Sequence, residues 1–289
     1  MLFNHESEFG ANGRRAVTVF GMSGVGKTRV SALLRKFGWF HYSIDYRIGT
    51  RYMGEFIVDN FKLEAMKVPF LRDLLNSDSI YISQNITFNN LEPLSTYLGT
   101  PGDPERGGLP FDEYRRRQEQ HRVAEIYALN DMPYFIERAK ALYGYDNFIA
   151  DTGGSLIEVI DPADPEDPIV NMLSDNTVLL YIRGTDEDAD QLVARYKADP
   201  KPMYYPPAFL DAKWAEYKKL NGVSDDNDVD PNGFAVWGFE ELLHDRLPRY
   251  QALADRYGYV VEGTDVATIR DSNDFLDLMR KAIASRRAA

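Results

Sequence analysis

The stretch Gly21-Met22-Ser23-Gly24-Val25-Gly26-Lys27-Thr28 decides the fold of this chain. It has the form G-x-x-x-x-G-K-[S/T], the pattern of a phosphate-binding loop. The apolar run at 16–20 predicts a strand before it, and 27–37 predicts a helix after it, which is the context that the pattern requires. Glycines let backbone N–H groups curl around phosphate oxygens, and the helix N-terminus adds partial positive charge. The stretch therefore predicts a binding site for the phosphates of ATP.

The side chains of this loop have separate predicted roles. Lys27 can reach the β- and γ-phosphates, and the Thr28 hydroxyl can ligate Mg²⁺. ATP and Mg²⁺ are therefore the expected cofactors. The residues expected to surround the nucleotide are Gly21, Ser23, Gly24, Val25, Gly26, Lys27, Thr28, Arg29 and, much later in the chain, Arg195.

Composition excludes several classes of function. Of the 289 residues, 44% are hydrophobic and 27% charged, which is ordinary for a soluble globular protein. The net charge of −12 argues against a nonspecific nucleic-acid binder or a membrane-surface binder. The chain has no cysteine, which excludes disulfides, thiolate metal sites and a cysteine nucleophile. The start does not resemble a secretory signal, and no apolar run approaches the roughly 18 residues of a membrane span. We expect a cytoplasmic protein.

Strand-like and helix-like segments alternate along the chain. This order predicts a three-layer, doubly wound α/β fold with a mostly parallel five-stranded sheet, as a single domain over 1–289. The predicted strands are 16–20, 39–43, 147–151, 177–183 and 257–261. The predicted helices are 27–37, 111–129, 132–142, 186–197, 207–220, 238–256 and 273–285.

The segment at about 52–110 is less regular and predicts an insertion on the sheet. It contains an amphipathic stretch at 61–75, a strand-like run at 80–83 and a turn-rich run at 99–108. We expect it to be partly helical and to help form the pocket of a second substrate. A decorative subdomain, or an interface with a protein partner or a second copy of the chain, fits the same pattern.

Two carboxylates follow predicted strands, where open α/β sheets bind their ligands. Asp45 follows 39–43 and is expected to orient or deprotonate an acceptor hydroxyl. Asp151 ends 147–151 and is expected to hold Mg²⁺ together with Thr28. An aspartate that caps the next turn or helix would give the same pattern at either position. Gly153 and Gly154 follow Asp151 and would let a substrate approach the backbone.

Two basic segments are candidates for binding the charges of the substrates. In Arg115-Arg116-Arg117, one arginine directed inward could clamp a carboxylate or phosphate of the acceptor, and we assign this role to Arg116. The segment at about 196–206 contains prolines and Lys201 and is expected to form a mobile lid over the phosphates. An ordinary surface loop is the alternative. His41, His121 and His244 show no metal-ligand spacing, so we expect them to be structural.

Taken in order, these motifs resemble the shikimate kinase branch of the small phosphate-loop kinases, relatives of the nucleoside monophosphate kinases. The loop has that branch's G-x-x-G-x-G-K-[S/T] form. The other matching motifs are Asp45-Tyr46-Arg47-Ile48 (D-x-x-I), Arg116-Arg117-Gln118-Glu119 (R-x-x-E), Thr152-Gly153-Gly154, Asp199-Pro200-Lys201-Pro202 and the stretch from Arg246 to Asp255 (R-x-P-x-Y-x-x-x-A-D). The resemblance implies that Asp45 contacts the acceptor, that Arg116 holds its carboxylate and that Lys201 acts from the lid.

The chain also departs from that pattern. Ser43 stands in place of the first aspartate of a D-x-D pair, Gly49 in place of an acid, Ser155 in place of a third glycine and Lys201 in place of the lid arginine. The resemblance does not cover 52–110. It therefore implies the fold and phosphoryl chemistry, but not shikimate as the acceptor.

The function expected from these patterns is transfer of the γ-phosphoryl group of ATP to a small-molecule acceptor, with Lys27, Asp45, Asp151 and Lys201 as catalytic residues. One alternative is an ATPase or nucleotide-dependent regulator without a small-molecule acceptor, in which 52–110 binds a protein. The other is a nucleoside or nucleotide kinase, in which aromatic residues of 52–110 stack on a base. The sequence leaves the acceptor and the oligomeric state open.

Overall fold

The computed structural model describes residues 1–3, 5–11 and 13–288 and divides the chain into two compact units. The first, which we call the sheet unit, comprises Met1–Ile44, Ile126–Asp199 and Val236–Ala289. The second, the helical unit, comprises Asp45–Glu125 and Pro200–Ala235. The predicted insertion at 52–110 lies within the helical unit, which is wider than that segment at both ends and includes a second stretch of chain.

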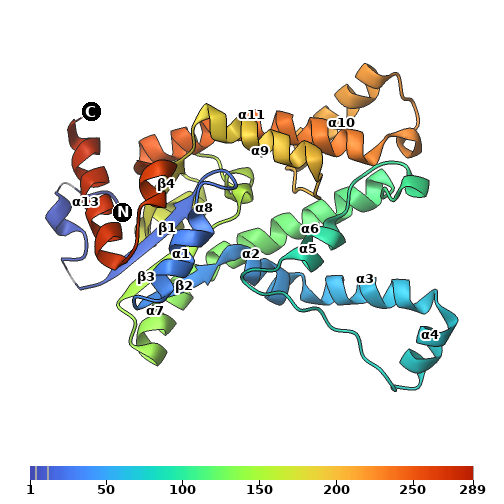
Figure 1. The fold of residues 1–289 in the computed structure, drawn as a ribbon, viewed down its shortest axis with the longest axis horizontal. Coiled ribbons are helices and arrows are strands. Elements are labelled where there is room, and N and C mark those ends of the chain that lie inside the picture. The colour runs from blue at the N-terminus through green and yellow to red at the C-terminus, as the bar shows by residue number, and fades with distance from the viewer. Residues whose placement is uncertain (4, 12, 289) are drawn as a thin grey trace. The chain divides into compact units, whose positions relative to one another are not determined.

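The sheet unit contains one five-stranded sheet in the order β2-β3-β1-β4-β5, and every pair of neighbouring strands is parallel. Helices cover both faces (Figure 1). This confirms the predicted doubly wound α/β fold of phosphate-loop kinase type. The strands are β1 (Arg15–Phe20), β2 (Trp39–Ser43), β3 (Asn147–Asp151), β4 (Val178–Arg183) and β5 (Gly258–Glu262).

The helices of the sheet unit follow the predicted pattern with two additions. They are α1 (Lys27–Arg35), α7 (Met132–Tyr143), α8 (Pro168–Asn176), α9 (Asp186–Ala198), α12 (Gly263–Ala267), α13 (Ser272–Ala288) and most of α11 (Pro231–Tyr257), with short 3-10 turns η1 (Glu6–Glu8) and η4 (Gly154–Glu158). The sequence predicted neither the short α12 nor α8. The carboxylate of Asp167 caps it by accepting hydrogen bonds from Ile169 N and Val170 N, and Pro168 occupies the first turn, where a missing N–H costs little.

The core of the sheet unit is rich in aromatic side chains at the carboxyl ends of the central strands. Phe20 of β1 stacks on Tyr181 of β4 at 5.4 Å between ring centroids, and Tyr250 of α11 lies 5.8 Å from Tyr181. All three rings are at most 3% exposed. Burying side chains of this size contributes about 2–3 kcal/mol each, so this cluster fixes α11 against the strands that flank the phosphate-binding loop.

The helical unit is built from α2 (Ile44–Arg47), α3 (Gly54–Met66), α4 (Pro69–Asn76), α5 (Glu92–Leu98), α6 (Phe111–Asn130) and α10 (Pro207–Asn221), with the π-helical turn η2 (Ile48–Tyr52) and the 3-10 turns η3 (Pro104–Arg106) and η5 (Asp226–Asp228). Trp214 of α10 forms its centre. Its ring stacks on Phe111 at 4.5 Å and meets Phe234 edge-on at 4.8 Å, while its Nε1 donates a hydrogen bond to Asp226.

Two expectations for the segment 52–110 need correction. The amphipathic stretch at 61–75 is not one helix but parts of α3 and α4. The break falls at Val68, because the residue before Pro69 is driven to an extended conformation (φ −96°, ψ 112°). The strand-like run at 80–83 forms neither helix nor strand. A strand needs a neighbour to pair with, and Tyr81 is instead 89% exposed.

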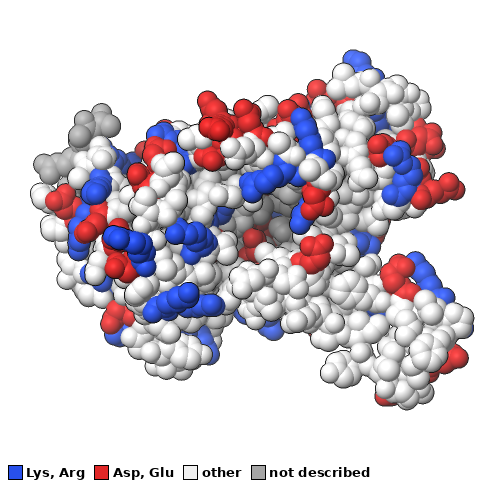
Figure 2. All heavy atoms as spheres, viewed as in Figure 1, with Lys and Arg blue, Asp and Glu red and all other residues white. Residues whose placement is uncertain are grey.

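Acidic and basic side chains are interspersed over the face of the molecule shown in Figure 2. Within the described residues, no helix is long and apolar enough to cross a membrane.

Candidate functional site

The phosphate-binding loop joins β1 to α1 and takes backbone conformations that glycine adopts readily. Gly24 and Gly26 have φ of 91° and 98°, in the left-handed region that costs other residues roughly 1–2 kcal/mol. Gly26 is the N-cap of α1, and Val30 N donates to its carbonyl oxygen at 2.9 Å. This is the backbone geometry with which such loops present N–H groups to a phosphate. Of the other predicted loop residues, Val25 is buried, whereas Ser23 and Thr28 are exposed.

Lys27 is held within the loop that precedes it. Its Nζ donates hydrogen bonds to the carbonyl oxygens of Gly21 and Met22, both at 2.8 Å, and the residue is only 7% exposed. The buried ammonium thus lies inside the curve of the loop, where a phosphate oxygen could replace a carbonyl as its partner. This position fits the predicted role of Lys27.

Arg195 lies against the same loop although it is far away in sequence. A Cβ atom built on Gly24 would be 2.9 Å from the Arg195 Nη2. The helix that carries it, α9, begins with a capping box between Thr185 and Asp188. The guanidinium is exposed at the side of the loop, which places a fixed positive charge where the sequence predicted a nucleotide contact.

Arg29, also predicted to contact the nucleotide, uses its side chain elsewhere. Its Nη1 donates to the carbonyl oxygen of Val266 at 3.1 Å and its Nη2 to that of Ile269 at 3.5 Å. The guanidinium therefore ties α1 to α12 and the turn after it. Its backbone N–H, in the first turn of α1, is the part of Arg29 that fits the predicted contact.

Asp151 lies at the carboxyl end of β3, level with Val19 of β1 and Ser43 of β2. It is 5% exposed, and its Oδ2 lies 3.8 Å from Nε2 of the buried His41. The register places Asp151 at the edge of the sheet from which the phosphate-binding loop emerges. His41 was predicted to be merely structural. Its alternation with Ser43 on one face of β2 was visible in the sequence, but the pairing of β2 with β3 was not.

The turn after Asp151 is fixed by α11. The hydroxyl of Tyr250 donates to the carbonyl oxygen of Gly154 at 2.5 Å, and a Cβ on Gly154 would be 3.1 Å from Arg246 Nη1. The Nε of Arg246 donates to the fully buried Glu158 at 2.6 Å. The backbone of Gly153 and Gly154 therefore lies beside a buried arginine. A lone glutamate within the apolar run 156–160 was the available signal for this buried ion pair.

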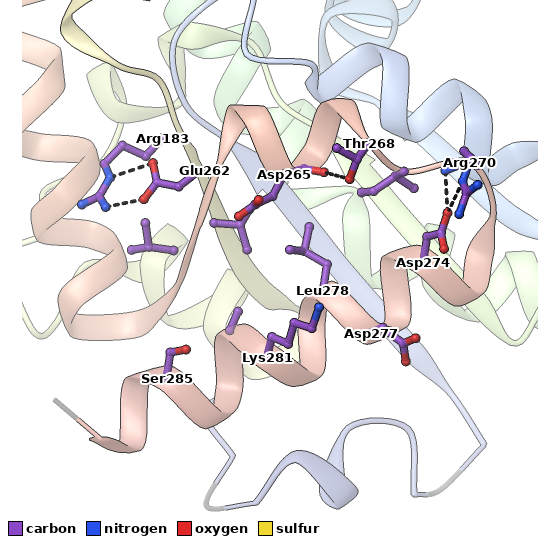
Figure 3. Close-up of a pocket in the computed structure, with 14 residues that line it drawn as sticks. Arg183, Glu262, Asp265, Thr268, Arg270, Asp274, Asp277, Leu278, Lys281 and Ser285 are labelled. Atoms are coloured by element: carbon purple, nitrogen blue, oxygen red, sulfur yellow. Dashed lines mark hydrogen bonds and ion pairs between the residues drawn. The ribbon is translucent and has the colours of Figure 1, made fainter.

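A groove of about 890 Å³ lies beside the edge strand β5 (Figure 3). Its charges are largely paired: Arg183 faces Glu262 across the carboxyl ends of β4 and β5, and Arg270 pairs with Asp274 at 3.3 Å. The lining residues are Arg183, Val260, Val261, Glu262, Asp265, Thr268, Ile269, Arg270, Asp274, Asp277, Leu278, Lys281, Ala282 and Ser285. None of the predicted site residues is among them, so this groove is not the predicted reaction site.

Three of the predicted residues belong to the helical unit: Asp45, Arg116 and Lys201. Asp45 lies in the first turn of α2, two residues after the end of β2. Their convergence with the loop of the sheet unit stays a prediction.

The predicted lid at 196–206 is divided between the two units. Residues up to Ala198 belong to α9, and 201–206 have no regular structure. Lys201 is exposed, but the residues that follow it are held by α6: Tyr205 N donates to Gln118 Oε1 at 2.9 Å, and the Tyr114 hydroxyl donates to the carbonyl oxygen of Met203 at 3.0 Å.

Arg116 and Arg117 occupy different environments on α6. Arg116 has a 53% exposed side chain and binds Glu113 through Nε and Nη2, both at 2.8 Å. Arg117 is the buried one: it donates to Glu113 at 2.7 Å, to Asn60 at 3.1 Å and to the carbonyl oxygen of Tyr97. The hydrogen bond from Arg116, followed by that from Arg117, lowers the pKa of Glu113 to about 2. The arginine directed inward is thus Arg117, and its guanidinium stabilises the helical unit.

The groups predicted to hold Mg²⁺ are the Thr28 hydroxyl and the Asp151 carboxylate. Such a small set of oxygen ligands suits this ion. Mg²⁺ usually keeps several waters and substrate phosphates in its shell and needs only one or two protein ligands. Within the described part of the chain no group of three or more His, Cys, Asp or Glu side chains could hold a metal by itself. A magnesium site made by Thr28, Asp151 and ATP remains a prediction.

No family model matches the chain, and no curated protein matches it in sequence. Among solved structures, a shikimate kinase from Bacteroides thetaiotaomicron is similar, with 13% identity over 95% of this chain and 97% of that chain, and a TM-score of 0.38. At this identity and score the likeness carries no argument about activity. The functional conclusion depends on the loop and the residues around it.

Proposed function

We propose that this protein is an ATP- and Mg²⁺-dependent phosphotransferase that acts on a small-molecule acceptor. The observation that carries the proposal is the loop itself: left-handed glycines, a helix N-terminus and a buried Lys27 ammonium at the carboxyl edge of a parallel sheet. A loop of this shape fits a polyphosphate, because its amides and its lysine both offer hydrogen-bond donors and positive charge.

The protein's own residues divide the proposed work. Lys27 and the loop amides hold the β- and γ-phosphates, and Arg195 neutralises charge from the side of Gly24. Thr28 and Asp151 hold Mg²⁺, which when bound supplies positive charge to the phosphate oxygens. Preorganised charge of this kind favours the transition state because it need not reorient during transfer.

The helical unit supplies the proposed acceptor side. Asp45 would orient the acceptor hydroxyl and accept its proton, so that the acceptor oxygen could form a bond to the γ-phosphorus while the bond from that phosphorus to the bridging oxygen breaks and ADP leaves. Lys201 brings positive charge from the segment after α9. Arg116 contacts an anionic group of the acceptor, which requires exchange of its present partner Glu113.

The test is titration of Mg²⁺–ATP into the pure protein by calorimetry, followed by ATP turnover with a panel of hydroxy acids, sugars and nucleosides. We expect binding without an acceptor and turnover only with the right class of acceptor. Lys27→Ala should lower turnover by about 100-fold or more, because it removes a charge on the transferred phosphoryl group. Lys36→Ala, at the exposed end of α1, is the matched control and should change nothing.

Three results would contradict the proposal. The absence of binding heat would show that the loop does not bind the phosphates of ATP. Full turnover by Lys27→Ala would show that Lys27 does not have the role assigned to it. Steady ATP hydrolysis that no acceptor stimulates would instead identify an ATPase.

A further inference from the structure

The groove of about 890 Å³ beside β5 (Figure 3), which we call the edge groove, follows the last strand of the sheet. The hydrogen-bonded neighbour of β5 in the sheet is β4. Val260 and Val261 both line the groove, although successive side chains of a strand point to opposite faces of the sheet. A groove that touches both faces of β5 passes along its outer edge.

The main-chain polar groups of Val260 point toward this edge. The side chain of Arg286, on α13, donates a hydrogen bond to the carbonyl oxygen of Gly258, so that carbonyl is directed away from β4. The N–H and C=O of a strand residue point to the same side, and the side alternates along the strand, so those of Val260 are also directed away from β4. Within the described residues, no hydrogen bond from outside the sheet reaches either group of Val260.

The edge of β5 lacks the usual protection against a further strand. Edge strands are commonly blunted by proline, by lysine or by a segment that covers them. The strand reads Gly-Tyr-Val-Val-Glu, without proline or lysine, and its one charged residue, Glu262, stands at its end. Arg286 covers Gly258, but Val260 is half-buried and lines the groove. The centre of β5 is therefore available for pairing.

The edge groove also has the length of a short strand. One of its walls is a single face of α13, formed by the residues at 274, 277, 278, 281, 282 and 285. This helix runs back along β5, because it begins after α12 and brings Arg286 to Gly258 at the start of the strand. From Asp274 to Ser285 an α-helix rises ~16 Å, and about five residues of extended chain cover the same length.

Two charged side chains of the edge groove stand ready for a ligand. Within the described residues, neither the Lys281 ammonium nor the Asp265 carboxylate has an ion pair or a hydrogen bond, whereas the other charged side chains of the lining form ion pairs. Figure 3 shows Lys281 on the α13 side of the groove and Asp265 on the opposite side. A ligand with one acidic and one basic group complements both.

We propose that the edge groove binds an extended segment of a partner protein, which pairs with β5 as a sixth, antiparallel strand. One residue of the segment exchanges two hydrogen bonds with Val260, and antiparallel pairing is the slightly stronger kind. An acidic side chain of the segment lies against Lys281 and a basic one against Asp265, while apolar ones pack on Leu278 and Ala282. In strand addition of this kind, main-chain hydrogen bonds supply affinity and alternate side chains supply specificity. The contact needs neither ATP nor transfer, so it stands apart from the proposed function.

The probe is a phage-displayed library of linear heptapeptides, selected on the full chain. The enriched peptide is synthesised with fluorescein, and its affinity is measured by fluorescence anisotropy. We expect enriched peptides to carry an acidic and a basic residue among apolar ones. Methylation of the peptide's amide nitrogens, one at a time, should weaken binding about fivefold at alternate positions, because every second N–H of an added strand pairs with β5.

Two variants of the protein test the same contact. Val260→Pro removes the outward N–H without touching the ladder to β4, which is where an edge strand tolerates proline, and should weaken the peptide about fivefold. Lys281→Glu changes an exposed side chain and should weaken it about tenfold. A peptide whose acidic residue is replaced by lysine should bind Lys281→Glu as the original binds the wild type. A folding defect could not produce that recovery.

The matched control is Lys219→Glu, an exposed lysine near the end of α10 that does not line the edge groove. This variant should bind the peptide like the wild type. A library that enriches no peptide would overturn the proposal. So would methylation effects that do not alternate, or binding that a folded Val260→Pro or Lys281→Glu leaves unchanged. Urea unfolding shows whether each variant is folded, and Lys281→Glu with its matched peptide decides the question if Val260→Pro is not.

Discussion

At the scale of single residues, Gly24 links backbone geometry to the proposed nucleotide contact. Its φ of 91° is strained for alanine, and a Cβ there would press on the Arg195 guanidinium at 2.9 Å. Gly24→Ala should weaken Mg²⁺–ATP binding by about tenfold, because it both strains the loop and displaces a cation. Calorimetry measures the loss.

Gly38→Ala is the control for backbone strain. Gly38 has φ of 80°, but a Cβ there would meet nothing within 4 Å. Both variants should lose similar stability in urea, whereas only Gly24→Ala should lose affinity. Combining Gly24→Ala with Arg195→Ala should cost little more than either alone. Fully additive losses would show that Gly24 and Arg195 act independently.

Glu113 predicts a pH dependence of stability. Its folded pKa of about 2 lies below the ordinary 4.5 because of its hydrogen bonds from Arg116 and then Arg117. A depressed carboxylate pKa adds stability above the unfolded pKa, and the gain is lost as pH falls through the folded value. Glu113→Gln should therefore cost about 1 kcal/mol at pH 7, after allowance for solvent screening.

The measurement is urea unfolding of wild type and variant from pH 7 down to pH 3. The difference between them should shrink as the pH falls below about 4.5. Glu119→Gln, which removes a carboxylate paired with Arg122 alone, should cost less at pH 7. A difference for Glu113→Gln that stays constant with pH would rule out this ion pair as its source.

At the scale of helices and strands, contacts between α9 and α11 fix the position of Arg195. Tyr196 stacks on Phe239 at 3.9 Å between centroids, and Lys197 binds Glu240 at 3.0 Å. Tyr196→Ala should cost about 3 kcal/mol of stability and should also weaken Mg²⁺–ATP binding, because Arg195 is the adjacent residue. Tyr196→Phe keeps the ring and should retain affinity. Urea unfolding and calorimetry separate the two effects; unchanged affinity in Tyr196→Ala would show that α9 needs no support from α11.

The sequence predicted the strands well because their signal is local. Each of the five predicted strands ends within one residue of its position in the structure, since buried parallel strands read as short apolar runs bounded by turns. The predicted helix starts were equally close, with one exception. The helix predicted from 238 begins at Pro231, because Asp-Pro-Asn-Gly has the composition of a turn as well as that of a capped first turn.

Contacts between residues far apart in the sequence limited how much of the candidate site could be predicted. The loop and its lysine follow from one continuous motif, and Asp151 follows from the end of one strand. By contrast, the inward arginine is Arg117, because Tyr97 and Asn60 lie on its side of α6. The proximity of His41 to Asp151 depends on β2 pairing with β3. Neither arrangement is encoded in the spacing of neighbouring residues.

At the scale of the whole molecule, the chain passes between its two units four times. Two of these passages, at 125–126 and 235–236, fall inside the helices α6 and α11. Independent domains are usually joined by exposed linkers, whereas an interrupted helix loses hydrogen bonds and packing in both halves. We therefore expect the two units to unfold in one cooperative transition, as the prediction of a single domain requires.

Tryptophans provide a separate reporter for each unit. Trp39 of the sheet unit donates to Ser272 Oγ at 2.9 Å, and Trp214 lies in the core of the helical unit. One variant, Trp214→Phe with Trp237→Phe, keeps only Trp39; the other, Trp39→Phe with Trp237→Phe, keeps only Trp214. Each should show the same urea midpoint by fluorescence as by circular dichroism, since a two-state transition looks alike to every probe.

Repeating this experiment with Mg²⁺–ATP tests whether the two units unfold together. Saturating Mg²⁺–ATP should raise the midpoint reported by Trp214 as much as that reported by Trp39, because a ligand that binds only the folded state stabilises everything that unfolds with its site. If only the midpoint reported by Trp39 rose, the molecule would consist of two independently folding domains. In that case α6 and α11 would each unfold in the part that belongs to one unit and stay helical in the part that belongs to the other.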